Sequence, residues 1–259
     1  MGVLQQKLKA GQLALGTHVS MNDASVSELV GNVGFDYLWI DTEHSTIDLD
    51  HLQLHLIAAR AAGVSAIVRI PWNDPVRAKP VLEMGPDGLV FPQIQSYEEA
   101  ELAVQSCCYP PRGIRGFGPR RAVQYGRIPT SQYLEEIDDH LLKFLQIEHI
   151  DILKDLPRIV KIPEITGFVI GPCDFAASMG KIHDMGSPEV TRKIDEAIAI
   201  VRDANKVVAL SQGPCSDEVL HSWRRRGVQM ISIGSDVRSI LAGAEENLRR
   251  LKEVFSPEP

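Results

Sequence analysis

Eight short apolar segments recur along the chain, and a longer segment with helical character separates most of them from the next. Most of the segments are continuously apolar, which is typical of strands buried on both faces of a parallel sheet. Eight strand–helix units with no linker predict an α/β fold of the closed (β/α)8 or TIM-barrel type, with a doubly wound open sheet as the main alternative. The predicted strands are Leu13–Val19, Tyr37–Asp41, Ser65–Ile70, Gly88–Gln93, Lys143–Glu148, Gly167–Gly171, Val207–Gln212 and Met230–Gly234.

The segments between the strands carry recognisable helix boundaries. Asp74 stands directly before Pro75, and Ser96 precedes a segment with acidic residues in its first turn; both patterns indicate a helix N-terminus. An amphipathic helix is expected over about residues 236–255. Because no composition break interrupts the 259 residues, we expect one barrel domain over residues 1–259.

The composition narrows the functional class. The chain has 27 Lys+Arg against 34 Asp+Glu, a net charge of −7, which argues against nucleic acid as the main partner. No stretch approaches the ~18 continuous apolar residues of a membrane span. The four cysteines show no CxxC spacing, so reduced thiols in a cytoplasmic protein are the simplest interpretation. The composition therefore favours a cytoplasmic protein whose main partner is not nucleic acid.

Polar residues cluster at the carboxyl ends of the predicted strands, where barrels of this type form their active sites. Glu148 ends the fifth strand and Asp174 follows the sixth, and neighbouring strands lie ~4.8 Å apart, so the two carboxylates can share a divalent cation. The alternative is that each carboxylate caps a helix. The backbone of the Gly171–Asp174 segment offers N–H groups to an anion beside such an ion.

Two further strand-end residues have both a catalytic and a structural interpretation. Arg69 ends a buried strand and needs an anion, which is either a substrate or a structural carboxylate. His44 acts either as a general base or as a histidine hydrogen-bonded to backbone, and Glu83 is the candidate carboxylate that would orient it.

One long irregular stretch, Tyr109–Pro129, is rich in Gly, Pro and Arg. Loops of this length in a compact domain are usually functional or lie at an interface. Its arginines are expected either to receive an anionic end of a substrate, across a subunit interface, or to form surface and oligomer contacts; they are Arg112, Arg115, Arg120 and Arg121.

Several of these segments together resemble one enzyme family. WIDTEH, IVRIPWNDP, FPQIQS, YPPRGIRGFG, LQIEH and GPCDFAASMG occur in order within about residues 11–234. In this combination the chain is similar to the HpcH/HpaI aldolases. These are metal-dependent (class II) pyruvate aldolases of the pyruvate/phosphoenolpyruvate barrel superfamily, such as the 2-dehydro-3-deoxyglucarate and 4-hydroxy-2-oxoheptanedioate aldolases.

The resemblance implies a role for each matching residue. Glu148 and Asp174 match the ligands of a divalent metal ion (Mg²⁺, Mn²⁺ or Co²⁺), Arg69 matches the arginine that stabilises the enolate, and His44 matches the histidine of a proton-transfer dyad. Glu83 stands where the family usually has the Asp of that dyad. The residues implied to contact pyruvate are Gln146, Gly171, Pro172, Cys173 and Asp174.

The resemblance also implies the reaction and the assembly. We expect cleavage of a 2-oxo-4-hydroxy acid to pyruvate and an aldehyde. The alternatives are a decarboxylase of the oxaloacetate type and a non-catalytic barrel that binds a 2-oxo acid. A homo-oligomer (trimer or hexamer) that exchanges its last helix between subunits is expected. His18 stands where relatives often carry Trp, and residues 211–213 replace a more apolar wall, so a different aldehyde pocket is expected.

Overall fold

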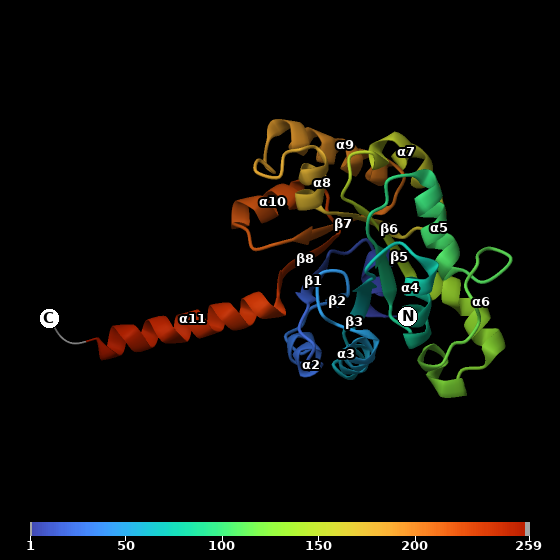
Figure 1. Cartoon of the computed structure of the whole chain (residues 1–259), viewed down its shortest axis with the longest axis horizontal. Helices are drawn as coiled ribbons and strands as arrows, with labels where there is room; N and C mark the ends of the chain where they lie inside the picture. Colours follow the sequence, from blue (N-terminus) through green and yellow to red (C-terminus); the bar gives the residue numbers. More distant parts are fainter. Residues whose placement is uncertain (1, 257–259) are drawn as a thin grey trace.

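The computed structural model describes residues 2–256 and contains a closed barrel of eight parallel strands, so the TIM-barrel prediction is confirmed (Figure 1). Each strand pairs with the next along the chain, and β8 closes the barrel against β1. The strands are β1 (Ala14–Val19), β2 (Tyr37–Asp41), β3 (Ser65–Arg69), β4 (Gly88–Phe91), β5 (Leu142–Ile147), β6 (Gly167–Ile170), β7 (Val207–Gln212) and β8 (Met230–Ser235). Each lies within two residues of its predicted bounds.

Helices surround the barrel, and the predicted caps are present. Asp74 accepts hydrogen bonds from two backbone N–H groups of the helix that begins at Pro75, and Ser96 forms a capping box with Glu99. The helices are α1 (Val3–Lys9), α2 (Ser25–Gly31), α3 (Leu49–Ala61), α4 (Pro75–Met84), α5 (Tyr97–Cys107), α6 (Thr130–His140), α7 (Ile152–Ile159), α8 (Pro172–Ser178), α9 (Pro188–Asp203), α10 (Asp217–Arg225) and α11 (Asp236–Phe255), with a 3₁₀ helix η1 (Arg121–Gly126). None of the helices in residues 2–256 is long and apolar enough to cross a membrane.

Two apolar layers fill the molecule. One lies inside the barrel and includes Tyr37, Trp39 and Phe144; the other lies between the strands and the surrounding helices. Gly16 leaves room for the Tyr37 ring, because a Cβ at this position would lie 2.4 Å from the ring carbon Cζ. The packed interior means that substrates reach the barrel only at its ends.

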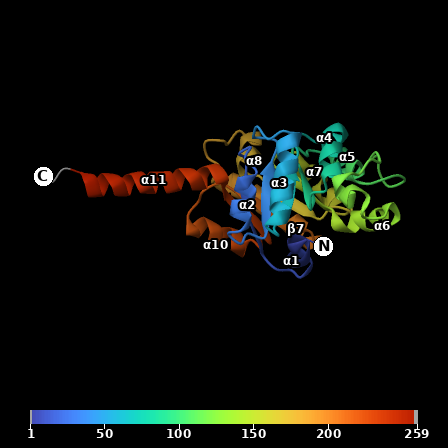
Figure 2. The ribbon, with the colours of Figure 1, turned by 90° about the horizontal axis from the view of Figure 1, so that it is seen from below.

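The last helix, α11, begins at the barrel but does not pack on it. The Asp236 carboxylate accepts hydrogen bonds from the N–H groups of Ser20 and Met21 and from the Ser20 hydroxyl, which fixes the start of the helix to the loop after β1. Beyond Asp236 the helix projects away from the barrel (Figures 1 and 2). Its bounds agree with the C-terminal helix expected over residues 236–255.

The long arginine-rich stretch lies between α5 and α6, at the amino-terminal end of the barrel. Arg115 has a fully buried side chain that donates to the Tyr133 hydroxyl and pairs with Glu83. Arg121 donates to the backbone carbonyls of Met84 and Leu56. Because α5 carries the chain to the end of the barrel opposite the strand carboxyl ends, contact of these arginines with a substrate across a subunit interface and a role in oligomer contacts both stay predictions.

Candidate active site

The carboxyl ends of β2, β3 and β5 bring charged side chains together at one end of the barrel. Asp41 ends β2 and is the register partner of Arg69, which ends β3. Glu148 directly follows β5. All three residues are at most 9% exposed, so their charges must be satisfied by one another or by a ligand.

Arg69 forms two ion pairs with residues of the β2 end. Its Nε and Nη2 atoms donate to the two oxygens of Asp41, at 2.9 and 2.5 Å, and its Nη1 atom lies 2.9 Å from Oε2 of Glu43. Two of the five guanidinium N–H donors make hydrogen bonds, both to Asp41, and the contact with Glu43 is an ion pair whose Oε2 atom has no hydrogen-bond partner in the described part of the chain. Both interpretations of Arg69 are compatible with this geometry, because the structural carboxylates orient a guanidinium that still has free donors.

Glu148 is held in place from two sides. Its Oε1 accepts a 2.6 Å hydrogen bond from the backbone N–H of Gln93, and its Oε2 accepts one of 2.6 Å from the Gln146 side chain. Gln93 has a positive φ of 57°, a conformation that costs a non-glycine residue about 1–3 kcal/mol and is found preferentially at functional sites. Oε1 of Gln146 is buried without a partner in the described part of the chain.

The carboxylates of this site carry more negative charge than one arginine neutralises. Burial, together with the charges of Glu43 and Asp174, raises the pKa of Glu148 to about 7 against the opposing hydrogen bond from Gln93. Burial likewise raises the pKa of Glu43 to about 7, opposed by Arg69. Burial works against ionisation of Asp41 too, yet the Arg69 guanidinium holds its pKa below the ordinary value.

This charge imbalance fits a divalent cation. Asp174 lies on the first turn of α8, close enough for its charge to raise the pKa values of Glu43 and Glu148. Within residues 2–256 no group of three or more His, Cys, Asp and Glu side chains is arranged to hold a metal ion. A hard ion such as Mg²⁺ is commonly bound by one or two carboxylates and keeps its other positions for water or substrate oxygens. Glu148 and Asp174 therefore fit such an ion better than an ion that needs all of its ligands from the protein.

Gly171 allows Glu148 to occupy its position. A Cβ on Gly171 would lie 3.1 Å from Cβ of Glu148 and 3.4 Å from its Oε2 atom, closer than most real Cβ contacts. We expect Gly171→Ala to displace the Glu148 carboxylate and to weaken divalent-metal binding by about tenfold, as changes beside metal ligands commonly do. Metal titration by calorimetry measures the effect. Gly186→Ala, at a site with open space around the added Cβ, is the control, and equal affinities in the two variants would contradict this account.

The segment after β6 offers fewer backbone donors than its sequence indicates. The N–H group of Gly171 donates to the Ile147 carbonyl as part of the sheet, and Pro172 has no N–H. Gly171 and Pro172 therefore offer no free backbone N–H group to a ligand, and substrate contact by the segment stays a prediction. Cys173 and Asp174, in the first turn of α8, retain backbone N–H groups that point out of the helix.

The structure separates His44 from Glu83. His44 lies in the loop after β2, with a side chain 66% exposed, and Nε2 of its ring lies 3.9 Å from Glu43. Glu83 lies in the last turn of α4, at the other end of the barrel, where it pairs with Arg115. The prediction that Glu83 orients His44 is wrong within one chain; Glu43 is the carboxylate beside the imidazole.

His18 is a further residue of this end of the barrel. Its Nε2 atom lies 2.9 Å from the Ser232 hydroxyl and 3.3 Å from that of Ser211, and its ring stacks on Trp39 at 5.1 Å between centroids. Burial lowers its pKa to about 4, helped by the charge of Arg69, so the ring is neutral near pH 7. The expectation that active-site residues lie at the carboxyl ends of the strands finds His18 and Glu43. No sequence pattern predicts which residues they contact.

Comparisons with known proteins identify the family of the chain. The sequence profile of the HpcH/HpaI aldolase/citrate lyase family matches residues 15–242. The 4-hydroxy-2-oxo-heptane-1,7-dioate aldolase of Klebsiella pneumoniae subsp. pneumoniae is 34% identical over 240 residues, which cover 92% of this chain and 89% of that protein.

Solved structures of the same family share the fold of this chain. The structure of an HpcH/HpaI aldolase/citrate lyase family protein from Burkholderia cenocepacia J2315 superposes with a TM-score of 0.90 at 26% identity, covering 97% of this chain and 100% of that one. The HpcH/HpaI aldolase from Desulfitobacterium hafniense DCB-2, at 24% identity, shares the fold with a TM-score of 0.89 over 99% of both chains. The chain therefore belongs to the HpcH/HpaI aldolase/citrate lyase family, and it is an enzyme with aldehyde-lyase activity.

Proposed function

We propose that the enzyme cleaves a 2-oxo-4-hydroxy acid to pyruvate and an aldehyde at the carboxyl end of its barrel. The observation that carries the proposal is the arrangement of Arg69, with donors that make no hydrogen bond within the described chain, beside the buried carboxylate Glu148, whose pKa burial raises to about 7. The 34% identical relative, whose name gives 4-hydroxy-2-oxo-heptane-1,7-dioate as its substrate, supports a substrate of this class.

Each residue has a defined part in the cleavage. Removal of the proton from the C4 hydroxyl lets the C3–C4 bond break, and its electrons move to form the enolate of pyruvate while the aldehyde leaves. The N–H donors of Arg69 that make no hydrogen bond to Asp41 stabilise the negative charge that develops on the enolate oxygen. Protonation of the enolate at C3 then gives pyruvate.

His44 is the proposed base for the C4 hydroxyl. Its imidazole is exposed at the barrel end, so a substrate can reach it, and Glu43 lies beside it to favour the protonated form during the reaction. Glu148 and Asp174 would hold the divalent ion, Mg²⁺, Mn²⁺ or Co²⁺, which supplies polarisation of the 2-oxo group when bound.

Exchange of the pyruvate methyl protons in D2O tests the proposal without knowledge of the aldehyde. We expect the methyl signal in the NMR spectrum to decay when Mg²⁺, Mn²⁺ or Co²⁺ is added, and the decay to stop with EDTA. Arg69→Ala should slow the exchange by about a hundredfold, because it removes the donors that stabilise the enolate.

The matched control for Arg69 is Arg192→Ala, an exposed arginine on α9. Pyruvate that binds to the metal-loaded enzyme but shows no exchange with any of the three ions would overturn the proposed chemistry and favour a non-catalytic 2-oxo-acid-binding barrel.

We also propose that the enzyme is a homo-oligomer, a trimer or hexamer, in which α11 packs on a neighbouring subunit. Support comes from the projecting helix (Figure 2) and from an apolar groove on the barrel side. The groove has a volume of about 710 Å³ and is lined by Leu13, Leu15, Trp223 and Ile231 among others. This groove lies over β1 and β8, where a barrel of this type normally carries its last helix. The four cysteines are free thiols, which supports a cytoplasmic location.

A further inference from the structure

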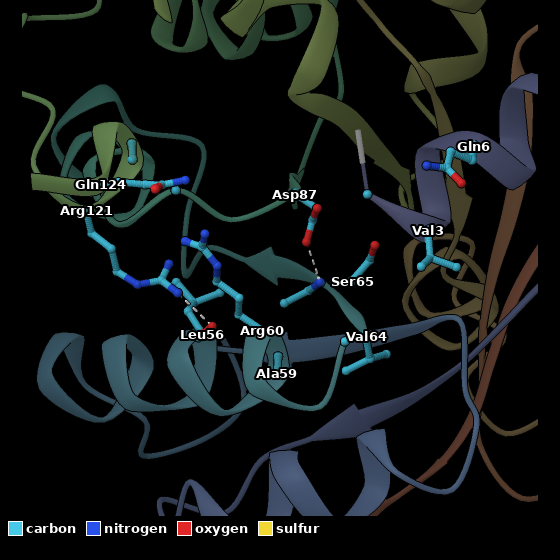
Figure 3. Close-up of a pocket in the computed structure, with 15 residues that line it drawn as sticks. Val3, Gln6, Leu56, Ala59, Arg60, Val64, Ser65, Asp87, Arg121 and Gln124 are labelled. Carbon is cyan, nitrogen blue, oxygen red and sulfur yellow. Dashed lines mark hydrogen bonds between the residues drawn. The ribbon is translucent and has the colours of Figure 1, made fainter. Parts of the chain in front are cut away.

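A cavity of about 490 Å³ lies at the amino-terminal end of the barrel, opposite the proposed active site (Figure 3). The end of α3, the beginnings of β3 and β4, and η1 form most of its walls. None of the residues assigned to the aldolase reaction lines it.

Arg121 places a buried positive charge at this cavity. The residue is 9% exposed, and its guanidinium donates to the carbonyls of Met84 and Leu56 at 2.6 and 2.8 Å. Within the described chain it forms no ion pair with a carboxylate. Its hydrogen bonds go only to neutral carbonyls, and the Asp87 carboxylate stabilises its charge from a distance without a direct ion pair, so the buried cation is incompletely neutralised.

Arg60 adds a second positive charge to the same space. It lies on the last turn of α3, and Figure 3 shows its side chain beside that of Arg121. No carboxylate of residues 2–256 forms an ion pair with it. Burial lowers the pKa of Arg121, and the charge of Arg60 lowers it further. The two guanidinium groups therefore repel each other across the cavity.

Asp87 is the acidic residue that lines the cavity, and it does not balance two arginines. Its Oδ2 accepts a 2.8 Å hydrogen bond from the N–H group of Ala66, and burial raises its pKa. Even when ionised, it supplies one negative charge against two positive charges. The cavity therefore keeps an excess of positive charge.

The backbone that carries Arg121 is held in an uncommon conformation. Gln124, whose side chain lines the cavity, has a φ of 50°, and Tyr125 has a φ of 57°. Such conformations are strained for non-glycine residues and are found preferentially at ligand sites.

We propose that this cavity binds a small oxyanion, a phosphate- or carboxylate-bearing metabolite, between Arg60 and Arg121. Planar guanidinium groups match the geometry of phosphate and carboxylate oxygens, and hydrogen bonds between charged groups are about twice as strong as neutral ones. The open side of the cavity faces solvent, so the anion reaches it without passing the active site.

Calorimetric titration of the EDTA-treated full chain with inorganic phosphate and with succinate tests the site. We expect one of the two anions to bind, and Arg60→Gln to weaken that binding at least about tenfold. Because Arg60 is exposed and makes no ion pair in the described chain, the variant should keep the thermal unfolding midpoint and the pyruvate exchange rate of the parent enzyme. Binding of phosphate alone or of succinate alone tells which metabolite class the site takes.

Two further variants make the result decisive. Arg192→Gln, on α9, removes an equivalent exposed charge elsewhere and should leave the affinity unchanged. Arg69→Ala tests binding at the catalytic end instead. Absence of binding by both anions, or binding that is lost in Arg69→Ala and kept in Arg60→Gln, would overturn the proposed site.

Discussion

Glu148→Gln is expected to reduce metal-dependent pyruvate exchange by about a thousandfold or more, because it removes one of the two proposed protein ligands of the divalent ion. The substitution keeps the size of the side chain and an oxygen that can accept from the Gln93 N–H group. It removes the negative charge on which binding of a hard divalent ion depends. NMR measurement of methyl exchange, with the ion concentration raised to saturation, separates weaker metal binding from slower chemistry.

When no metal is present, the free energy of unfolding of Glu148→Gln should depend on pH differently from that of the parent enzyme. Burial raises the folded-state pKa of Glu148 from 4.5 to about 7, so between these values the folded protein binds a proton that the unfolded chain does not. This contribution to stability is present at low pH and is lost as the pH rises through about 7. In EDTA, the enzyme should therefore lose stability relative to Glu148→Gln between pH 5 and pH 8.

Urea unfolding at several pH values measures this difference, and Glu101→Gln, at an exposed position on α5, is the matched control. A parallel pH dependence of the parent enzyme and of Glu148→Gln would contradict the raised pKa. Full exchange activity in Glu148→Gln at ordinary metal concentrations would remove Glu148 from the metal site.

The barrel was predictable because its strands are continuously apolar, short and regularly spaced. Helices were less uniformly predictable. Two helices are too short to show a helical repeat: α7 has 8 residues, with Pro157 inside it, and α8 has 7. By contrast, the side-chain caps Asp74 and Ser96 mark the beginnings of their helices. The sequence thus predicts a helix best where a capping side chain or a long amphipathic face is present.

The positions of Arg69 and Glu148 were predictable because parallel strands place all their carboxyl ends at one end of the barrel. Glu83 illustrates the limit of sequence reasoning. It lies on a helix of 10 residues, about 15 Å long, which carries it from the end where His44 lies to the opposite end. The ion pairs of Arg69 with Asp41 and Glu43 depend on the register of β2 and β3 and on rotamers, which the sequence does not specify.

The second large effect concerns the last helix. Leu248→Asp combined with Leu251→Asp should weaken subunit association by about a hundredfold, because each leucine contributes about 1.5 kcal/mol when its apolar surface is buried. The two residues are 52% and 56% exposed in the single chain, on the face of α11 that also carries Ile240, Leu241 and Phe255. Analytical ultracentrifugation over a range of concentrations measures the association constant.

The exposed apolar face of α11 is the physical reason to expect association of subunits. An isolated helix of 20 residues is marginally stable in water, so α11 needs packing of its apolar face. The groove over β1 and β8 needs a cover of the same kind. A neighbouring copy satisfies both needs at once, since each chain supplies one helix and one groove.

Arg250→Asp, on the more polar side of α11, introduces the same new carboxylate and should leave the association constant unchanged. Because Asp236 fixes the start of the helix to Ser20 and Met21 within the same chain, the double aspartate variant should keep its barrel folded, with a far-UV circular dichroism spectrum of the parent type. An unchanged association constant in the folded double variant would show that the apolar face of α11 does not hold the subunits together, and some other surface would then have to cover the groove.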